Sequence, residues 1–196
     1  TFSGAYLLSI SLLHLIPDLY SNALGSSGER IGFFILFGFL IQIFLEYFSQ
    51  GVEHGHLHKN NTISISIMMS LCLHALIEGV PLGTLEETSL SRDSNVLSHP
   101  LLIGIFLHKI PVSIVLCVFF LESEMSKLKI VMLLIVFACM APLGLYMGNQ
   151  IEVFRNYQNE IMAIVIGIFL YISTTILFES SDQHKLSLQK IITIIV

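Results

Sequence analysis

Long apolar runs separated by short polar stretches dominate the chain. A helix needs about 20 apolar residues to cross the hydrocarbon layer of a bilayer. Because helices satisfy every backbone group in lipid, and because the polar connectors are short, the pattern predicts an all-α fold of antiparallel transmembrane helices. We expect a single transmembrane domain over residues 1–196, with spans near 2–20, 31–48, 63–85, 99–121, 128–149 and 161–180 and a partial span at 186–196.

The composition agrees with a membrane-embedded chain and excludes several other classes. Of the 196 residues, 54% are hydrophobic and 12% are charged, whereas soluble domains carry about 25% charged residues. The net charge of -5, without a basic cluster, argues against a nucleic-acid partner. All the cysteines fall inside apolar runs, which argues against a disulfide framework or a zinc knuckle. We therefore expect the lipid bilayer to surround the chain.

The ends and the connectors set expectations about completeness and orientation. The chain begins with Thr1 instead of methionine and ends inside an apolar run, so we expect a fragment whose terminal spans are missing or partial. If the spans alternate in direction, five lysines in and beside the connectors lie on one side of the membrane and three arginines on the other: Lys59, Lys127, Lys129, Lys185 and Lys190 against Arg30, Arg92 and Arg155. By the positive-inside rule, this bias predicts that the histidine-containing loop at 50–61 is cytoplasmic.

Ionisable side chains inside the apolar runs carry the functional signal, because charge at mid-membrane is costly and is kept for pairing or function. His74 and Glu78 are four residues apart, so they lie on one face of a helix. An imidazole beside a carboxylate suits a borderline cation such as Zn²⁺, and His108 in the next run supplies a third ligand. A His–Glu hydrogen bond that only joins helices is the alternative. We favour metal binding, because the run holds no other charge.

Other polar residues in the runs are candidates for supporting roles. His14 is a further candidate metal ligand, on the side from which the metal approaches or leaves. Lys109 requires an anion, and Glu78 is the expected partner, so we expect Lys109 to tune the charge at the site or simply to neutralise it. We expect Asp18 and Ser113 to act in the same supporting way, although Asp18 lies near the end of its run, where water can solvate it.

Histidines alternate in the connector after the second run, at His54, His56 and His58. Short histidine-rich tracts bind metals weakly and exchangeably, so this loop is a candidate metal-binding segment. A flexible polar linker is the alternative.

These motifs together resemble the ZIP family (Zrt-/Irt-like proteins), which imports zinc, iron or manganese toward the cytoplasm. The resemblance covers nearly the whole chain. It is carried by His74-Ala75-Leu76-Ile77-Glu78-Gly79, His108-Lys109-Ile110-Pro111, His14-Leu15-Ile16-Pro17-Asp18, Cys139-Met140-Ala141-Pro142-Leu143-Gly144, Gly167-Ile168-Phe169-Leu170-Tyr171-Ile172 and the loop Glu53 to His58.

The resemblance implies a ZIP-type bundle, a transporter and not an enzyme. Family members have eight spans, so the chain resembles spans two to seven and part of span eight, with the fourth and fifth between two inverted repeats. It also implies a homodimer, in the plasma (inner) membrane, with no fixed cofactor. The cargo is a metal cation substrate, with Zn²⁺ first and Fe²⁺ or Mn²⁺ as alternatives.

The chain departs from the family at the position of a second metal. Many members place polar or acidic ligands where this chain has Ala75, Val112 and Ala141, and Lys109 follows the fifth-span histidine. The resemblance therefore implies a single transported metal at His74, Glu78 and His108, with the Lys109 ammonium standing in for the second cation.

Three alternatives stay open at this point. An intramembrane zinc-dependent hydrolase would hold zinc permanently with three protein ligands and an activated water, but the chain shows neither a His-Glu-x-x-His motif nor a clear second acid. A metal exporter would usually carry a cytoplasmic metal-binding domain after its last span. A metal sensor is the third alternative.

Overall fold

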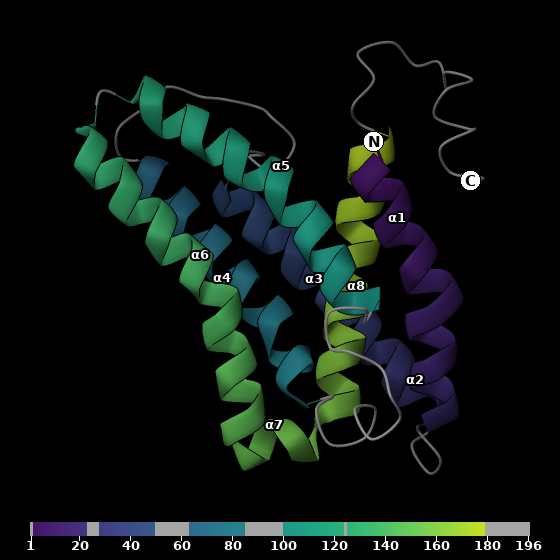
Figure 1. The fold of residues 1–196 in the computed structure, drawn as a ribbon. Coiled ribbons are helices and arrows are strands. Elements are labelled where there is room, and N and C mark those ends of the chain that lie inside the picture. Colours follow the sequence, from purple (N-terminus) through teal and green to yellow (C-terminus); the bar gives the residue numbers. More distant parts are fainter. Residues whose placement is uncertain (1, 23–27, 50–62, 85–99, 124, 179–196) are drawn as a thin grey trace.

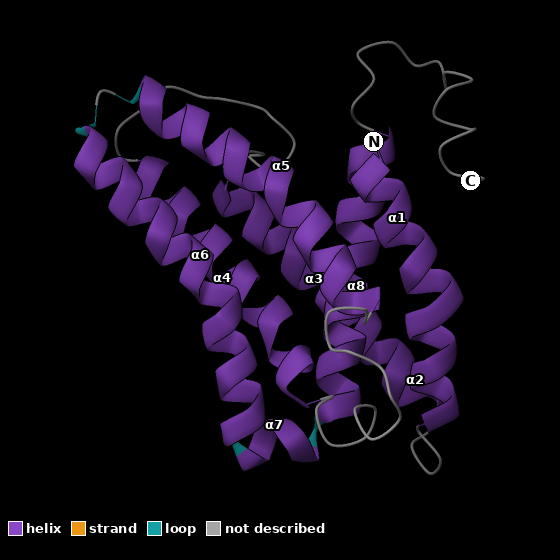
Figure 2. Cartoon of the chain, in the orientation of Figure 1, coloured by secondary structure: helices purple, strands orange, loops and turns teal. Residues whose placement is uncertain are grey.

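A computed structural model describes residues 2–22, 28–49, 63–84, 100–123 and 125–178 of the chain (Figure 1). Within these ranges the regular elements are all helical, as Figure 2 shows, which confirms the predicted all-α bundle. The elements are α1 (Phe2–Ile10), η1 (Ser11–Leu15), α2 (Ile16–Asn22), α3 (Gly28–Ser49), α4 (Ile63–Thr84), α5 (Pro100–Glu122), α6 (Lys127–Gln150), α7 (Glu152–Asn156) and α8 (Gln158–Phe178).

Six helices of the described chain are long and apolar enough to cross a membrane, with α1, η1 and α2 counted as one. Large apolar side chains on their outer faces are exposed, among them Phe33, Phe106 and Tyr146. An apolar outer surface of this extent suits lipid and not water. The chain is therefore an integral membrane protein.

The first span is not a regular α-helix. Residues Ser11–Leu15 form the π-helical turn η1 between α1 and α2, and His14 lies in it. The apolar pattern predicts a helix there but carries no signal for this wider turn, since π-helical turns depend on local packing and often mark functional positions.

Two helix pairs, α4 with α6 and α3 with α8, pack at very close range (Figure 1). A Cβ atom added to Gly79 of α4 would collide with the backbone carbonyl of Ala141 on α6, and one added to Gly144 of α6 would collide with that of Leu76. Small residues at such positions let helix backbones approach in a membrane, where packing rather than the hydrophobic effect drives association. The pair of α4 and α6 is therefore a tight structural unit.

Buried apolar side chains form two clusters. One lies among α1, α3, α8 and the first half of α5, and it includes Ile105. The other lies among α4, α6 and the second half of α5, and it includes Val112. Helix α5 is shared between the clusters, and His108 lies on it between Ile105 and Val112. His108 therefore lies where α5 passes from one packed cluster to the other.

Candidate metal site

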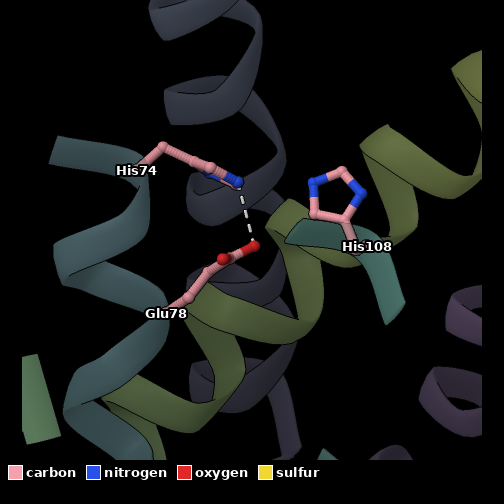
Figure 3. Close-up of side chains that lie close together, drawn as sticks. All are labelled: His74, Glu78 and His108. Atoms are coloured by element: carbon pink, nitrogen blue, oxygen red, sulfur yellow. Dashed lines mark ion pairs between the residues drawn. The ribbon is translucent and has the colours of Figure 1, made fainter. Parts of the chain in front are cut away.

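His74, Glu78 and His108 converge in the interior of the bundle. Each offers a ligand atom, a ring nitrogen or a carboxylate oxygen, and these atoms all lie within 4.8 Å of one another. All three side chains have 0% of their surface exposed. Figure 3 shows His74 and Glu78 pointing from α4 toward His108 on α5. Within the described ranges, this is the group of histidine, cysteine and acidic side chains with the geometry to hold a metal ion.

Helix geometry brings the two α4 ligands together. Residues four apart lie one above the other on a helix of 3.6 residues per turn. The His74 Nε2 atom lies 2.9 Å from Glu78 Oε1 (Figure 3). The nitrogen of one side chain and the oxygen of the other therefore already face each other, as two ligands of one dication would.

His108 completes the group from the neighbouring helix. Its ring lies with its centroid 5.9 Å from that of His74, at an interplanar angle of 86°. Pro111 lies one turn further along α5 and has no N–H, so the carbonyl of Leu107 loses its usual helical donor. The His74 Nδ1 atom is buried without a hydrogen-bond partner among the described residues.

Lys109 neutralises the acid. Its Nζ atom lies 2.6 Å from Glu78 Oε2, and its side chain is 17% exposed. The two oxygens of one carboxylate are therefore divided between an imidazole and an ammonium. With neutral imidazoles the unit formed by Glu78 and Lys109 has no net charge, which makes it tolerable in a bundle interior.

The other predicted site residues lie apart from this group. His14 in η1 and Asp18 in α2 have exposed side chains and are not members of the cluster. The Ser113 hydroxyl donates to the carbonyl of Ile110 on its own helix at 2.8 Å. Their proposed roles therefore stay predictions.

His54, His56 and His58, like residues 186–196, fall outside the described residues.

The structure also places polar and aromatic residues that the sequence argument passed over. Ser11 and Gln42 are fully buried inside spans. The Ser70 hydroxyl on α4 donates to the Leu45 carbonyl on α3 at 2.5 Å. A polar residue inside an apolar run was a usable signal for these residues. Phe137 of α6 has its ring 5.5 Å from Lys109 Nζ, and no sequence pattern distinguishes it from a core phenylalanine.

Comparison with known proteins agrees with these features. The family profile described as "ZIP Zinc transporter" matches residues 50–196, more than half of the chain. "Zinc transporter ZIP1" of Danio rerio is 26% identical over 223 residues, which cover 88% of this chain and 72% of that protein. "Protein zntD" of Dictyostelium discoideum is 26% identical over 149 residues, which cover 67% of this chain and 21% of that protein. No solved structure matches.

Proposed function

The chain belongs to the ZIP zinc transporter family, and from this premise we propose that it carries zinc through one intramembrane site formed by His74, Glu78 and His108. Metal-ion transport, and not catalysis, is the activity of the family. The observation that carries the proposal is the convergence of three buried ligands, with ligand atoms within 4.8 Å of one another, on helices long enough to cross a membrane.

The chemistry of the ligands favours zinc. A dication cannot enter hydrocarbon with its charge uncompensated, so ligands must replace the waters that it loses. Two imidazoles and one carboxylate are a common zinc ligand set, with room for a water at a fourth position. Iron and manganese are the alternative cargoes. Manganese fits this ligand set less well than iron, because it prefers oxygen ligands.

Release is as important as binding in a transporter. Lys109 already neutralises one oxygen of Glu78, so zinc must share the charge of that carboxylate with an ammonium. Shared charge weakens the hold on the metal and favours exchange over storage. We propose that Lys109 tunes the site in this direction.

The position of the site suits alternating access. His74 and Glu78 belong to the packed group of α4 and α6, and His108 lies where α5 passes between the two apolar clusters. Transporters of this kind commonly move one group of helices against another around a site near the midplane. We propose that such a movement exposes the metal first to one side and then to the other, with the cytoplasm as the destination.

The other candidate residues have supporting roles along the path of the metal. His14 contacts the metal on its way to or from the site, with Asp18 and Ser113 adjusting the charge and the packing around the path. The loop residues His54, His56 and His58 bind the metal weakly on the cytoplasmic side. The protein acts as a homodimer in the plasma (inner) membrane.

The hydrolase alternative has no support. A zinc hydrolase needs a base beside its metal-bound water, and in the described part of the chain no second acid joins the three clustered residues. The family to which the chain belongs consists of transporters.

Uptake of radiolabelled zinc tests the proposal. Glu78→Ala removes the only acid of the three-residue group, so we expect uptake by expressing cells to fall to background while surface expression is unchanged. Glu152→Ala, which removes an exposed acid of α7, is the matched control and should transport normally. Competition by iron, manganese and cadmium reports selectivity. Undiminished uptake by the Glu78→Ala protein would refute the assignment.

A further inference from the structure

The ammonium of Lys109 lies between an acid and an aromatic ring from two other helices. Its Nζ atom is 2.6 Å from Glu78 Oε2 on α4 and 5.5 Å from the centroid of the Phe137 ring on α6. Phe137 is 5% exposed and belongs to the apolar cluster of α4, α5 and α6. Three helices therefore meet at one positive charge.

The Phe137 ring stabilises the Lys109 ammonium in its position beside Glu78. The face of an aromatic ring attracts an ammonium within about 6 Å of its centroid, and the attraction grows when water is excluded. A lysine in an apolar span otherwise extends its flexible side chain toward the nearest water. Phe137 is packed among apolar side chains, so its ring gives Lys109 a second contact beside the carboxylate.

We propose that Phe137 is a positioning residue that sets the metal affinity of the site by holding Lys109 against Glu78. This inference rests on the proposed function, since it concerns the same carboxylate. Zinc and the ammonium compete for the charge of Glu78. A firmly held ammonium weakens zinc binding and speeds release, whereas a loosely held one leaves both oxygens of Glu78 to the metal.

The simpler role for Phe137 is packing in the apolar cluster. Packing predicts a loss of stability when the ring is truncated, but no change in metal affinity that depends on Lys109. The dependence on Lys109 is therefore the feature to measure, and a double-mutant cycle isolates it.

The experiment measures zinc affinity of the purified full chain by competition with a fluorescent chelator, together with the KM and the maximal rate of uptake. Phe137→Leu and Phe137→Met remove the ring and keep apolar volume, and Phe137→Tyr retains the ring. Each is made with Lys109 present and in a Lys109→Met background. Phe119→Leu is the matched control, because it removes a ring from the same apolar cluster at a position about 15 Å along α5 from Lys109.

We expect the Leu and Met variants to bind zinc roughly 2-fold to 30-fold more tightly, the range that a cation–π contact supports. Both the KM and the maximal rate of uptake should fall, because tighter binding slows release. Phe137→Tyr and Phe119→Leu should behave like the parent. In the Lys109→Met background, removal of the ring should change the affinity no further.

Two results would overturn the inference. One is parental zinc affinity in both Phe137→Leu and Phe137→Met. The other is an equal increase in zinc affinity with Lys109 present and in the Lys109→Met background. The Glu78→Ala protein distinguishes an error in the proposed metal site from an error in the role of Phe137. If it still binds zinc like the parent, the proposed site is wrong. If it loses zinc while the ring-less variants keep parental affinity, only the role of Phe137 is wrong.

Discussion

At the scale of single residues, Glu78 is the centre of the site because its two oxygens have different partners. Oε1 faces His74 Nε2 at 2.9 Å, and Oε2 faces Lys109 Nζ at 2.6 Å. Removing one member of a buried, charged group leaves the rest uncompensated, which makes these three residues interdependent.

Competition between zinc and protons gives a prediction about pH. Zinc requires imidazoles with a free nitrogen, so binding releases protons, and lowering the pH favours the metal-free site. We expect zinc uptake, measured at constant free zinc, to fall several-fold as the pH is lowered from about 7.5 to about 5.5, because protons compete with the metal for its nitrogen and oxygen ligands. A flat profile over this range would contradict direct coordination by His74 and His108.

At the scale of secondary-structure elements, the contact between α4 and α6 keeps the α4 ligands in place. Gly79 directly follows Glu78, and its Cα faces the backbone of Ala141. Because the helices touch through their backbones there, α4 can neither rotate nor shift without disturbing the direction of the Glu78 side chain. The glycine therefore links the packing of the bundle to the geometry of the site.

Alanine substitution tests this link. In Gly79→Ala the new methyl group meets the Ala141 carbonyl, so the helices must separate, and we expect a loss of about 1–3 kcal/mol in the free energy of unfolding. Gly32→Ala is the matched control, since the nearest atom to its added Cβ is the Tyr20 hydroxyl oxygen at an ordinary 3.9 Å. Thermal unfolding in detergent compares the two. Equal stability of both variants would show that the close approach is not needed.

At the scale of the whole molecule, the candidate site lies where α4 meets the helix that the two apolar clusters share. His74 and Glu78 come from α4, whereas His108 comes from the part of α5 that passes between the two apolar clusters. A metal bound by all three ties these parts together. A transporter must also undo that connection in every cycle, so we expect the ion to exchange readily.

Zinc-dependent stability tests both properties. A ligand that binds only the folded state adds about 2.7 kcal/mol at a concentration one hundred times its Kd. We expect zinc to raise the Tm of the parent chain by several degrees, a chelator to reverse the rise within minutes, and Glu78→Ala to abolish it. Zinc that stays bound through gel filtration with chelator would instead indicate a resident metal.

Several features could be predicted from the sequence because they depend on local spacing. The apolar runs predict the helices, and the four-residue interval between His74 and Glu78 places both on one helix face without any tertiary information. Lys109 needs an anion wherever it lies in a span, which indicated Glu78 as the partner before any distance was known. The motifs around these residues also resembled those of the family to which the chain belongs.

Other features depend on how the helices pack, which spacing along one chain does not encode. The sequence offered His14 and His108 as further ligands, and the structure groups His108, and not His14, with the α4 pair. The π-helical turn at Ser11–Leu15 and the ring of Phe137 beside Lys109 likewise arise from contacts between helices.

The sequence by itself thus determined the membrane class, the helices and the pairing of His74 with Glu78 on one face of α4, since hydropathy and helical periodicity act over a few turns. Only the tertiary structure decided which side chains from different helices share one small volume. The physical reason is that side chains of different helices come together only where the helix backbones and side-chain shapes allow close packing, as at Gly79 and Ala141.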